Sequence, residues 1–236
     1  MSIQEIFSRP EVSIACTIGF YMGGKYVYHR TKWLLFSPVI VSIVAVMLLL
    51  RFMKIPFEEY NQGGQWLTWP LGPSVVALGV LLHEKFELVK KQALGFLLSV
   101  VVGSLGSMLS IMALALFCKL PEELTLSILP KSITTPIALE VTAMVGGIPS
   151  LTAGVVIFVG IIGNAFGPLF LTFFKINRPA TIGLALGTAS HGIGTARAVE
   201  FGELAGAYSG LAMCLNGLLT VVTAPYLWQS LQPFFV

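Results

Sequence analysis

The chain has 236 residues, of which 56% are hydrophobic and 11% are charged, and its formal net charge is +3. A soluble globular domain carries roughly 25% charged residues, so this chain has too few charges to cover a globule in water. The composition therefore excludes an ordinary soluble protein and indicates a polytopic membrane protein, and its basic residues form no patch for nucleic acid.

Apolar segments recur along the chain at lengths that suit membrane crossings. A helix of about 20 apolar residues matches the roughly 30 Å hydrocarbon core of a bilayer. Backbone polar groups in lipid must pair within their own segment, so we expect these segments to be helices. In chain order they are residues 12–28, 33–52, 93–118, 151–174 and 204–231.

Three further apolar segments are interrupted or short. Residues 67–83 and 181–199 are rich in Gly, Pro, Ser and Thr, and residues 133–148 are short for a full crossing. We expect broken helices in the first two segments and a re-entrant element in the third. The predicted fold is all-α, with roughly seven or eight membrane segments.

Lysine and arginine residues near the segment ends predict the orientation. A basic cluster at residues 25–32 follows the first segment, whereas Arg9 precedes it, which predicts an N-terminus outside the cell and a first loop in the cytoplasm. Basic residues at 85–91 and 175–178 predict two more cytoplasmic loops. The last loop reaches the cytoplasm only if a segment before it turns back, and residues 133–148 are the candidate.

The two Gly-rich segments resemble each other. An ungapped alignment of residues 71–87 with residues 186–202 has an offset of 186 − 71 = 115 residues and matches Leu, Gly and Phe positions. Paired interrupted segments often mark the binding site of a transporter, although small residues also simply allow close helix packing. We expect a single membrane domain of two similar, inverted parts. Its predicted divisions are residues 1–118 as the first half, 119–131 as a linker and 132–236 as the second half.

The first interruption is the sequence PLGPS at residues 70–74. Two prolines bracket a glycine there, and proline breaks a helix because it cannot donate a backbone hydrogen bond. Ser74 would cap the half-helix beyond the break. Close packing of helices would explain this stretch almost as well.

The sequence KSITTPIALE at residues 131–140 has the pattern of a helix start. Thr134 and Thr135 offer capping hydroxyls, and Pro136 suits the first turn. A helix N-terminus within a membrane presents free N–H groups and a partial positive charge, which suit a carboxylate. Glu140 would lie about one turn further in and hold a proton or a cation. The alternative is an ordinary interfacial cap with Glu140 in water.

The sequence LGTASHGIGTARAVE at residues 186–200 places polar groups among Gly and Ala. In a helix His191 and Thr195 would share a face, and Arg197 and Glu200 would pair. Ionisable groups within membrane segments usually line a substrate path, and arginine offers a fork for a carboxylate. The alternative places Arg197 and Glu200 at the water interface and makes His191 a packing group.

These stretches together predict a site for a small carboxylate, with no metal and no cofactor. Catalysis has little support, because the sequence has no His-Glu-x-x-His, no P-loop and no Gly-x-Ser-x-Gly. The predicted proton- or ion-coupling residues are Glu140, His191 and Glu200. The predicted substrate-binding residues are Arg197, His191, Ser190, Thr195, Thr134, Thr135, Ser74 and Asn164, the last of which would otherwise join helices.

Two of these stretches resemble the signature of the LrgB/CidB family. They are LPKSITTPIA at residues 129–138, continuing to Glu140, and ASHGIGTARA at residues 189–198, and GNAFGP at residues 163–168 agrees with them. The resemblance implies a multi-pass protein of the bacterial inner membrane. Family members are commonly labelled antiholin-like and act with a smaller LrgA/CidA-type membrane partner on murein hydrolase activity and cell lysis. Related proteins include a plastidal glycolate/glycerate translocator and bacterial pyruvate carriers.

Two functions follow from the residues and the resemblance. The first is transport of small 2-hydroxy or 2-oxo monocarboxylates, with an LrgA-type partner or as a homo-oligomer. The alternative is an antiholin-like regulator of murein hydrolases without transport of its own. The residues favour transport, because Arg, His, Thr and half-helix ends suit a carboxylate, whereas the alternative predicts that Arg197 is dispensable.

Overall fold

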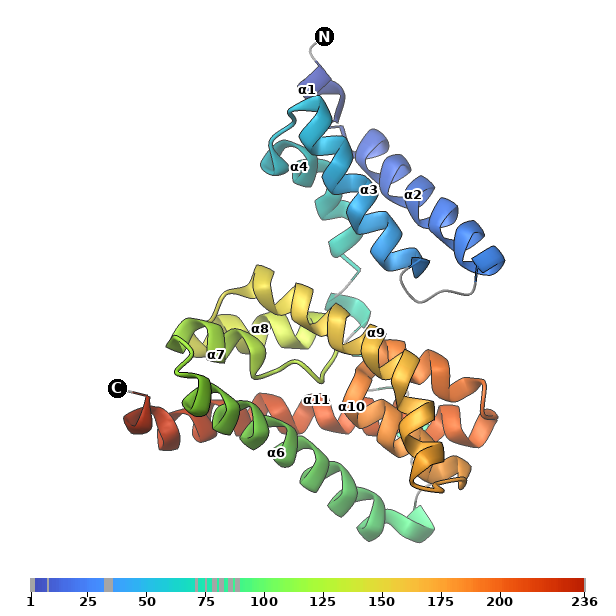
Figure 1. Cartoon of the computed structure of the whole chain (residues 1–236), viewed down its shortest axis with the longest axis vertical. Helices are drawn as coiled ribbons and strands as arrows, with labels where there is room; N and C mark the ends of the chain where they lie inside the picture. Colours follow the sequence, from blue (N-terminus) through green and yellow to red (C-terminus); the bar gives the residue numbers. More distant parts are fainter. Residues whose placement is uncertain are drawn as a thin grey trace. The chain divides into compact units, whose positions relative to one another are not determined.

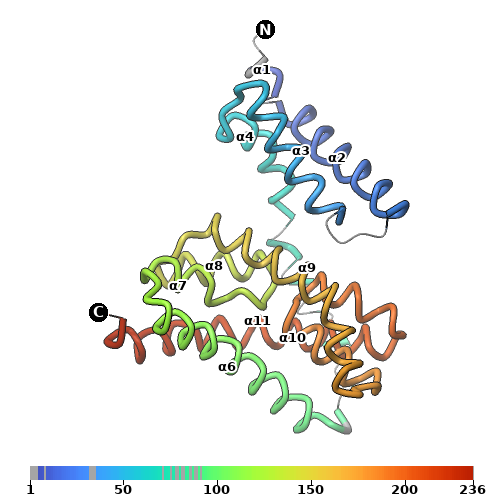
Figure 2. The backbone as a smooth tube through the Cα atoms, in the orientation of Figure 1, coloured from blue at the N-terminus to red at the C-terminus, as the bar shows by residue number. Residues whose placement is uncertain are grey.

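The computed structural model describes residues 3–7, 9–31, 36–70, 72–74, 76–77, 80, 83–84, 87 and 90–235. All regular elements among these residues are helices, as predicted (Figure 1, Figure 2). The chain divides into two compact units, Met1–Ser74 and Val75–Val236.

The described part of the first unit contains α1 (Ile3–Phe7), α2 (Pro10–Thr31), α3 (Pro38–Met53) and α4 (Phe57–Thr68). The helix α2 packs against both α3 and α4. The hydroxyl of Tyr60 on α4 donates a hydrogen bond to the carbonyl of Ser13 on α2 at 3.0 Å. A side chain at Gly63 would approach Ser13 Oγ to 2.6 Å, so this glycine permits the close approach of α4 to α2.

The second unit is built around its last long helix. Its elements are η2 (Lys90–Gln92), α6 (Ala93–Cys118), α7 (Glu122–Ile128), α8 (Thr135–Val145), α9 (Pro149–Phe173), α10 (Pro179–Val199), α11 (Glu203–Leu231) and η3 (Gln232–Phe234). The helix α11 runs along the unit and packs against α6, α8 and α10 (Figure 1). The largest hydrophobic cluster joins Met108 of α6, Ile133, Val141 of α8, Val156 of α9 and Ala224 of α11.

Three helices among the described residues are long and apolar enough to cross a membrane, and all lie in the second unit. They are α6, α9 and the stretch Glu203–Phe234, in agreement with three of the predicted segments. The helices α3 and α8 are apolar but shorter. The predicted segment at residues 12–28 is helical within α2, which does not meet the same criterion. The number of crossings therefore stays a prediction.

The predicted internal repeat falls partly outside the described residues. In its first copy, Leu71, Gly79 and Phe86 lie there. The duplication and the division into halves stay predictions.

The start of α9 lies beside the end of α7, so the chain between them returns to the place where it leaves. The backbone N–H of Ile148, just before α9, donates to the hydroxyl of Ser127 in α7 at 2.7 Å. Thr152 Oγ1 of α9 donates to the carbonyl of the same serine at 2.8 Å. With 7 and 11 residues, α7 and α8 are each too short for a crossing. The loop after α7 and the helix α8 thus form an excursion that begins and ends beside Ser127.

Candidate functional site

The helix α10 is broken in the middle, as its composition predicts. Ser190 and His191 have non-helical backbone angles, and His191 has φ 43° and ψ −138°. Two glycines of α9 make room for this break. A Cβ at Gly160 would approach the ring of His191 to 2.7 Å, and a Cβ at Gly163 would collide with the side chain of Ser190. The break in one helix is therefore packed into a small-residue face of another.

Polar side chains near the break hold its backbone in place. His191 Nε2 lies 2.9 Å from the carbonyl of Val156 on α9. Asn164 Nδ2 donates to the carbonyl of Ile193 at 3.2 Å, so this amide joins α9 to the second part of α10. Thr195 Oγ1 donates to the carbonyl of His191 at 2.9 Å. Each of these interactions ties α10 to a neighbour or to itself.

The first part of α10 lies unusually close to α11. A Cβ at Gly183 would collide with the carbonyl of Ala205, and a Cβ at Gly187 would collide with the carbonyl of Ser209. The Gly-xxx-Gly spacing thus produces the close backbone contact expected of it in membrane helices.

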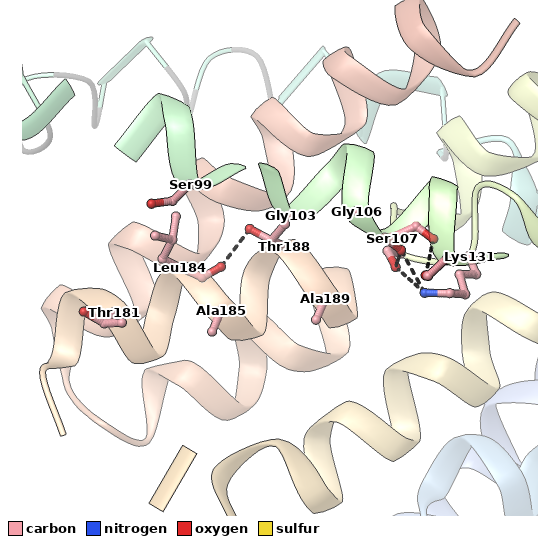
Figure 3. A pocket seen from close by; sticks show the side chains of 12 residues that line it. Ser99, Gly103, Gly106, Ser107, Lys131, Thr181, Leu184, Ala185, Thr188 and Ala189 are labelled. Atoms are coloured by element: carbon pink, nitrogen blue, oxygen red, sulfur yellow. Dashed lines mark hydrogen bonds between the residues drawn. The ribbon is translucent and has the colours of Figure 1, made fainter. Parts of the chain in front are cut away.

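A pocket of about 570 Å³ opens between α6, the α7–α8 loop and the first part of α10 (Figure 3). Its walls consist mostly of small and hydroxyl-bearing residues. The α10 wall comprises Thr181, Leu184, Ala185, Thr188 and Ala189. The other wall comprises Ser99, Gly103, Gly106, Ser107 and Ser110 of α6 together with Lys131 and Ser132 of the loop.

Among the described residues that line this pocket, Lys131 is the only charged one. Its Nζ donates hydrogen bonds to Ser107 Oγ at 2.9 Å and to Ser132 Oγ at 3.0 Å (Figure 3). The two hydroxyls also lie 3.0 Å apart and hydrogen-bond to each other. An ammonium group has three N–H donors, so one donor remains beyond these two bonds. The ammonium of Lys131 can therefore bind an anion in a pocket with largely uncharged walls.

The buried amide of Asn216 fastens both sides of this pocket to α11. Its Nδ2 donates to the carbonyl of Thr188 on α10 at 2.9 Å and to the carbonyl of Ser132 on the loop at 3.4 Å. The residue is 1% exposed. It therefore sets the distance between the loop that bears Lys131 and the α10 wall.

The residues predicted to bind a carboxylate are not brought together at this pocket. Arg197 forms an ion pair with Glu200 at the end of α10, and its guanidinium lies over the Phe201 ring. Glu140 is exposed on α8. These residues remain predictions as ligand or proton sites.

The threonines at the start of α8 occupy the predicted helix start. Thr134 is the N-cap in an extended conformation, and Thr135 opens the helix. The hydroxyl of Thr134 makes no capping bond, and its Oγ1 is buried without a hydrogen-bond partner among the described residues. Ser74 belongs to the first unit, where its N–H donates to the carbonyl of Pro70 at 3.0 Å.

Neither Lys131 nor Asn216 was predicted from the sequence to be part of a site. Lys131 lay at the end of the predicted linker, and Asn216 looked like an isolated interruption of an apolar segment. Both residues are polar groups within apolar sequence. Such groups are costly in a membrane and usually have a function, so this was the signal that the sequence offered. Among the described residues no cluster of three or more His, Cys, Asp or Glu side chains could hold a metal ion.

Comparison with known proteins agrees with the sequence motifs. Residues 17–230 match the model of the LrgB-like family. The chain belongs to the LrgB family. Among LrgB-family relatives, a Bacillus cereus (strain B4264) protein named antiholin-like protein LrgB is 35% identical over 90% of this chain and 92% of its own length.

Two Bacillus subtilis (strain 168) relatives are uncharacterized proteins, YwbG and YxaC. They are 37% and 36% identical to this chain, over 92% and 88% of it and over 96% and 90% of their own lengths. No solved structure gives a significant match. LrgB-family membership and three long apolar helices together identify a membrane protein.

Proposed function

We propose that this protein is a membrane carrier for small monocarboxylates and that Lys131 binds the carboxylate group. The observation that supports this proposal is the ammonium of Lys131 in a pocket walled by hydroxyls and glycines. Charged hydrogen bonds of this kind are about twice as strong as neutral ones. The carboxylate would accept a hydrogen bond from the third N–H of Lys131, which is not used by Ser107 or Ser132.

The polarity of the pocket favours a small and partly polar substrate. Hydroxyls of Ser110 and Ser99 and the apolar side chain of Leu184 line the same space. A 2-hydroxy or 2-oxo acid has a second oxygen next to its carboxylate, which such hydroxyls can bind. Pyruvate, glycolate and glycerate are the substrates to test first.

The broken helix supports transport rather than static binding. The break at Ser190 and His191 resembles the discontinuous helices that form the substrate sites of many transporters. The α10 wall of the pocket lies on the first part of this helix, whereas the second part is joined to α9 by Asn164.

Uptake of labelled pyruvate, glycolate and glycerate into proteoliposomes tests the proposal, with the protein alone and with an LrgA-type partner. We expect saturable uptake that Lys131→Met weakens by about 10- to 100-fold, because a charged hydrogen bond is worth roughly 1.5–3 kcal/mol. The matched control is Lys119→Met, which removes an exposed lysine that caps α6. An Arg197→Ala variant tests the residue that the sequence favours.

Each variant must first give a monodisperse sample with a cooperative melting transition. Loss of uptake in Arg197→Ala with normal uptake in Lys131→Met would move the carboxylate site to the end of α10. Absence of uptake by the folded wild-type protein, with and without the partner, would refute the carrier.

The second candidate is an antiholin-like regulator of murein hydrolase activity, with or without an LrgA-type partner. The name of the Bacillus cereus relative favours this function. Lysis assays in cells that carry Lys131→Met separate the two candidates. Normal control of lysis by a transport-dead but folded variant would support regulation without transport, whereas parallel loss of both would make regulation a consequence of transport.

A further inference from the structure

A second, much smaller cavity lies inside the second unit beside Asn216. The two N–H groups of this amide are engaged, but its Oδ1 is buried without a hydrogen-bond partner among the described residues. Oδ1 belongs to a side chain that is 1% exposed. An unpaired carbonyl in such a place is costly, so a bound group that donates a hydrogen bond is expected there.

The walls of the cavity supply further hydrogen-bonding groups. The centre of a water molecule has about 10 Å³ in which to move, which is close to the room that one ordered water needs. Four hydroxyls line this space together with Asn216, and they belong to Ser104, Ser107, Ser132 and Thr220. A buried water usually makes two to four hydrogen bonds, and these groups provide that number.

The charges around the cavity favour water over a cation. None of the described residues that line the cavity carries a carboxylate. The ammonium of Lys131 already donates to Ser107 and Ser132, two of the hydroxyls that a cation would need as ligands. A second positive charge a few ångströms from Nζ would be repelled strongly in an interior of low dielectric constant.

The direction of the hydrogen bonds also fits a water. Lys131 donates to both serine hydroxyls, and one serine donates to the other. One serine proton is therefore left to donate into the cavity. Thr220 Oγ1 uses its own proton on the carbonyl of Asn216 at 2.8 Å, so its oxygen acts as an acceptor there. The cavity thus presents one donor and at least two acceptors.

We propose that one water molecule occupies this cavity, donates to Oδ1 of Asn216 and accepts from the Ser107–Ser132 hydroxyl pair. The water completes a hydrogen-bonded chain from Lys131 at the pocket to α11 in the core. It makes Asn216 a positioning residue for Lys131. This last consequence rests on the proposed function, whereas the water site itself does not.

An experimental structure of the full chain that resolves ordered waters tests the site directly. We expect a density peak at about 2.7–3.0 Å from Asn216 Oδ1 and from a serine hydroxyl. An empty cavity would overturn the proposal. A peak with several oxygen ligands at about 2.3–2.6 Å would identify a cation and would overturn it as well.

A thermal unfolding series provides a second readout on the wild-type protein. We expect the same melting temperature in sodium, potassium and choline chloride at equal ionic strength. A rise specific to sodium that disappears in Asn216→Ala would show a cation site in place of the water.

Two substitutions at one position separate the water from the carrier function. Ser104→Ala keeps the cavity open, whereas Ser104→Val replaces the hydroxyl by a methyl group and adds a second methyl group that narrows the cavity. We expect the water peak to persist in Ser104→Ala and to vanish in Ser104→Val, with a several-fold higher KM for the carboxylate in Ser104→Val alone. An equal KM in both variants would refute the positioning role. A water peak in a wild-type protein that transports no carboxylate would refute the carrier and leave the water site standing.

Discussion

The backbone of His191 adopts angles that side-chain-bearing residues rarely take. With φ 43° and ψ −138° it lies in a region that glycine occupies easily and other residues only at a cost of roughly 1–3 kcal/mol. Its imidazole, by contrast, makes a specific contact with the carbonyl of Val156. Strained residues of this kind often lie at functional breaks, which is consistent with the position of His191 between the two parts of α10.

Replacing His191 by glycine and by alanine measures this backbone strain. Both variants lose the imidazole, so their difference reports on the backbone alone. We expect His191→Gly to be more stable than His191→Ala by about 1 kcal/mol, the reverse of the order within a regular helix. Thermal unfolding in detergent measures the difference.

The control for this pair lies in the same helix. Ala196 is exposed and helical, so Ala196→Gly is expected to lower stability by about 0.5–1 kcal/mol. An alanine variant of His191 at least as stable as the glycine variant would show that the break carries no strain.

At the scale of elements, small residues decide which helices approach each other. The helix α10 contacts α11 through Gly183 and Gly187, and α9 receives the break through Gly160 and Gly163. These glycines remove the Cβ atoms that would otherwise separate the backbones. The spacing of these residues was visible in the sequence, but their partners were not, because any of several helices could have supplied the facing surface.

A glycine-to-alanine pair tests this packing. In Gly187→Ala the new methyl group would collide with the Ser209 carbonyl on α11, and backbone atoms cannot yield cheaply. We expect a loss of roughly 1–3 kcal/mol of stability, as for other overpacked sites. Gly154→Ala on α9 is the control, because its methyl group meets nothing within 4 Å and should stabilise the helix by about 0.5–1 kcal/mol. Similar melting temperatures for the two variants would contradict the close contact.

At the scale of the whole molecule, the excursion between α7 and α9 predicts a membrane topology. The start of α9 meets the end of α7 at Ser127, and α7 has only 7 residues, so α6 would end and α9 would begin on the same side of the membrane. If the basic residues at 85–91 lie in the cytoplasm, as the positive-inside rule predicts, α6 would lead outward and α9 would lead back to residues 175–178. A full crossing by the excursion would instead place residues 175–178 outside.

Cysteine labelling distinguishes these two topologies. Cys118 lies exposed at the end of α6, and Asn177 lies exposed after α9. With the other cysteines replaced, we expect an impermeant maleimide to label Cys118 in intact cells and to label an Asn177→Cys variant only after permeabilisation. Labelling of both positions from the same side would show that the α7–α8 segment crosses the membrane.

Much of the candidate site was predictable as a set of segments but not as a set of contacts. The stretch at residues 131–140 and the break in residues 186–200 were both identified, since proline, glycine and hydroxyl residues act locally on the backbone. Arg197 was favoured as the carboxylate ligand because arginine suits that chemistry. Its ion pair with Glu200, at the spacing of one helical turn, was also predicted from the sequence and is present in the structure.

The sequence by itself determined a helical membrane protein with interrupted segments, because hydropathy, proline and glycine act through neighbouring residues and the surrounding solvent. Only the tertiary structure decided which polar groups meet. Lys131 reaches Ser107 across 24 residues, and Asn216 reaches Thr188 across 28 residues and Ser132 across 84. Such distant pairs depend on how helices pack, and packing is set by the complementary shapes of whole helix faces rather than by any local pattern.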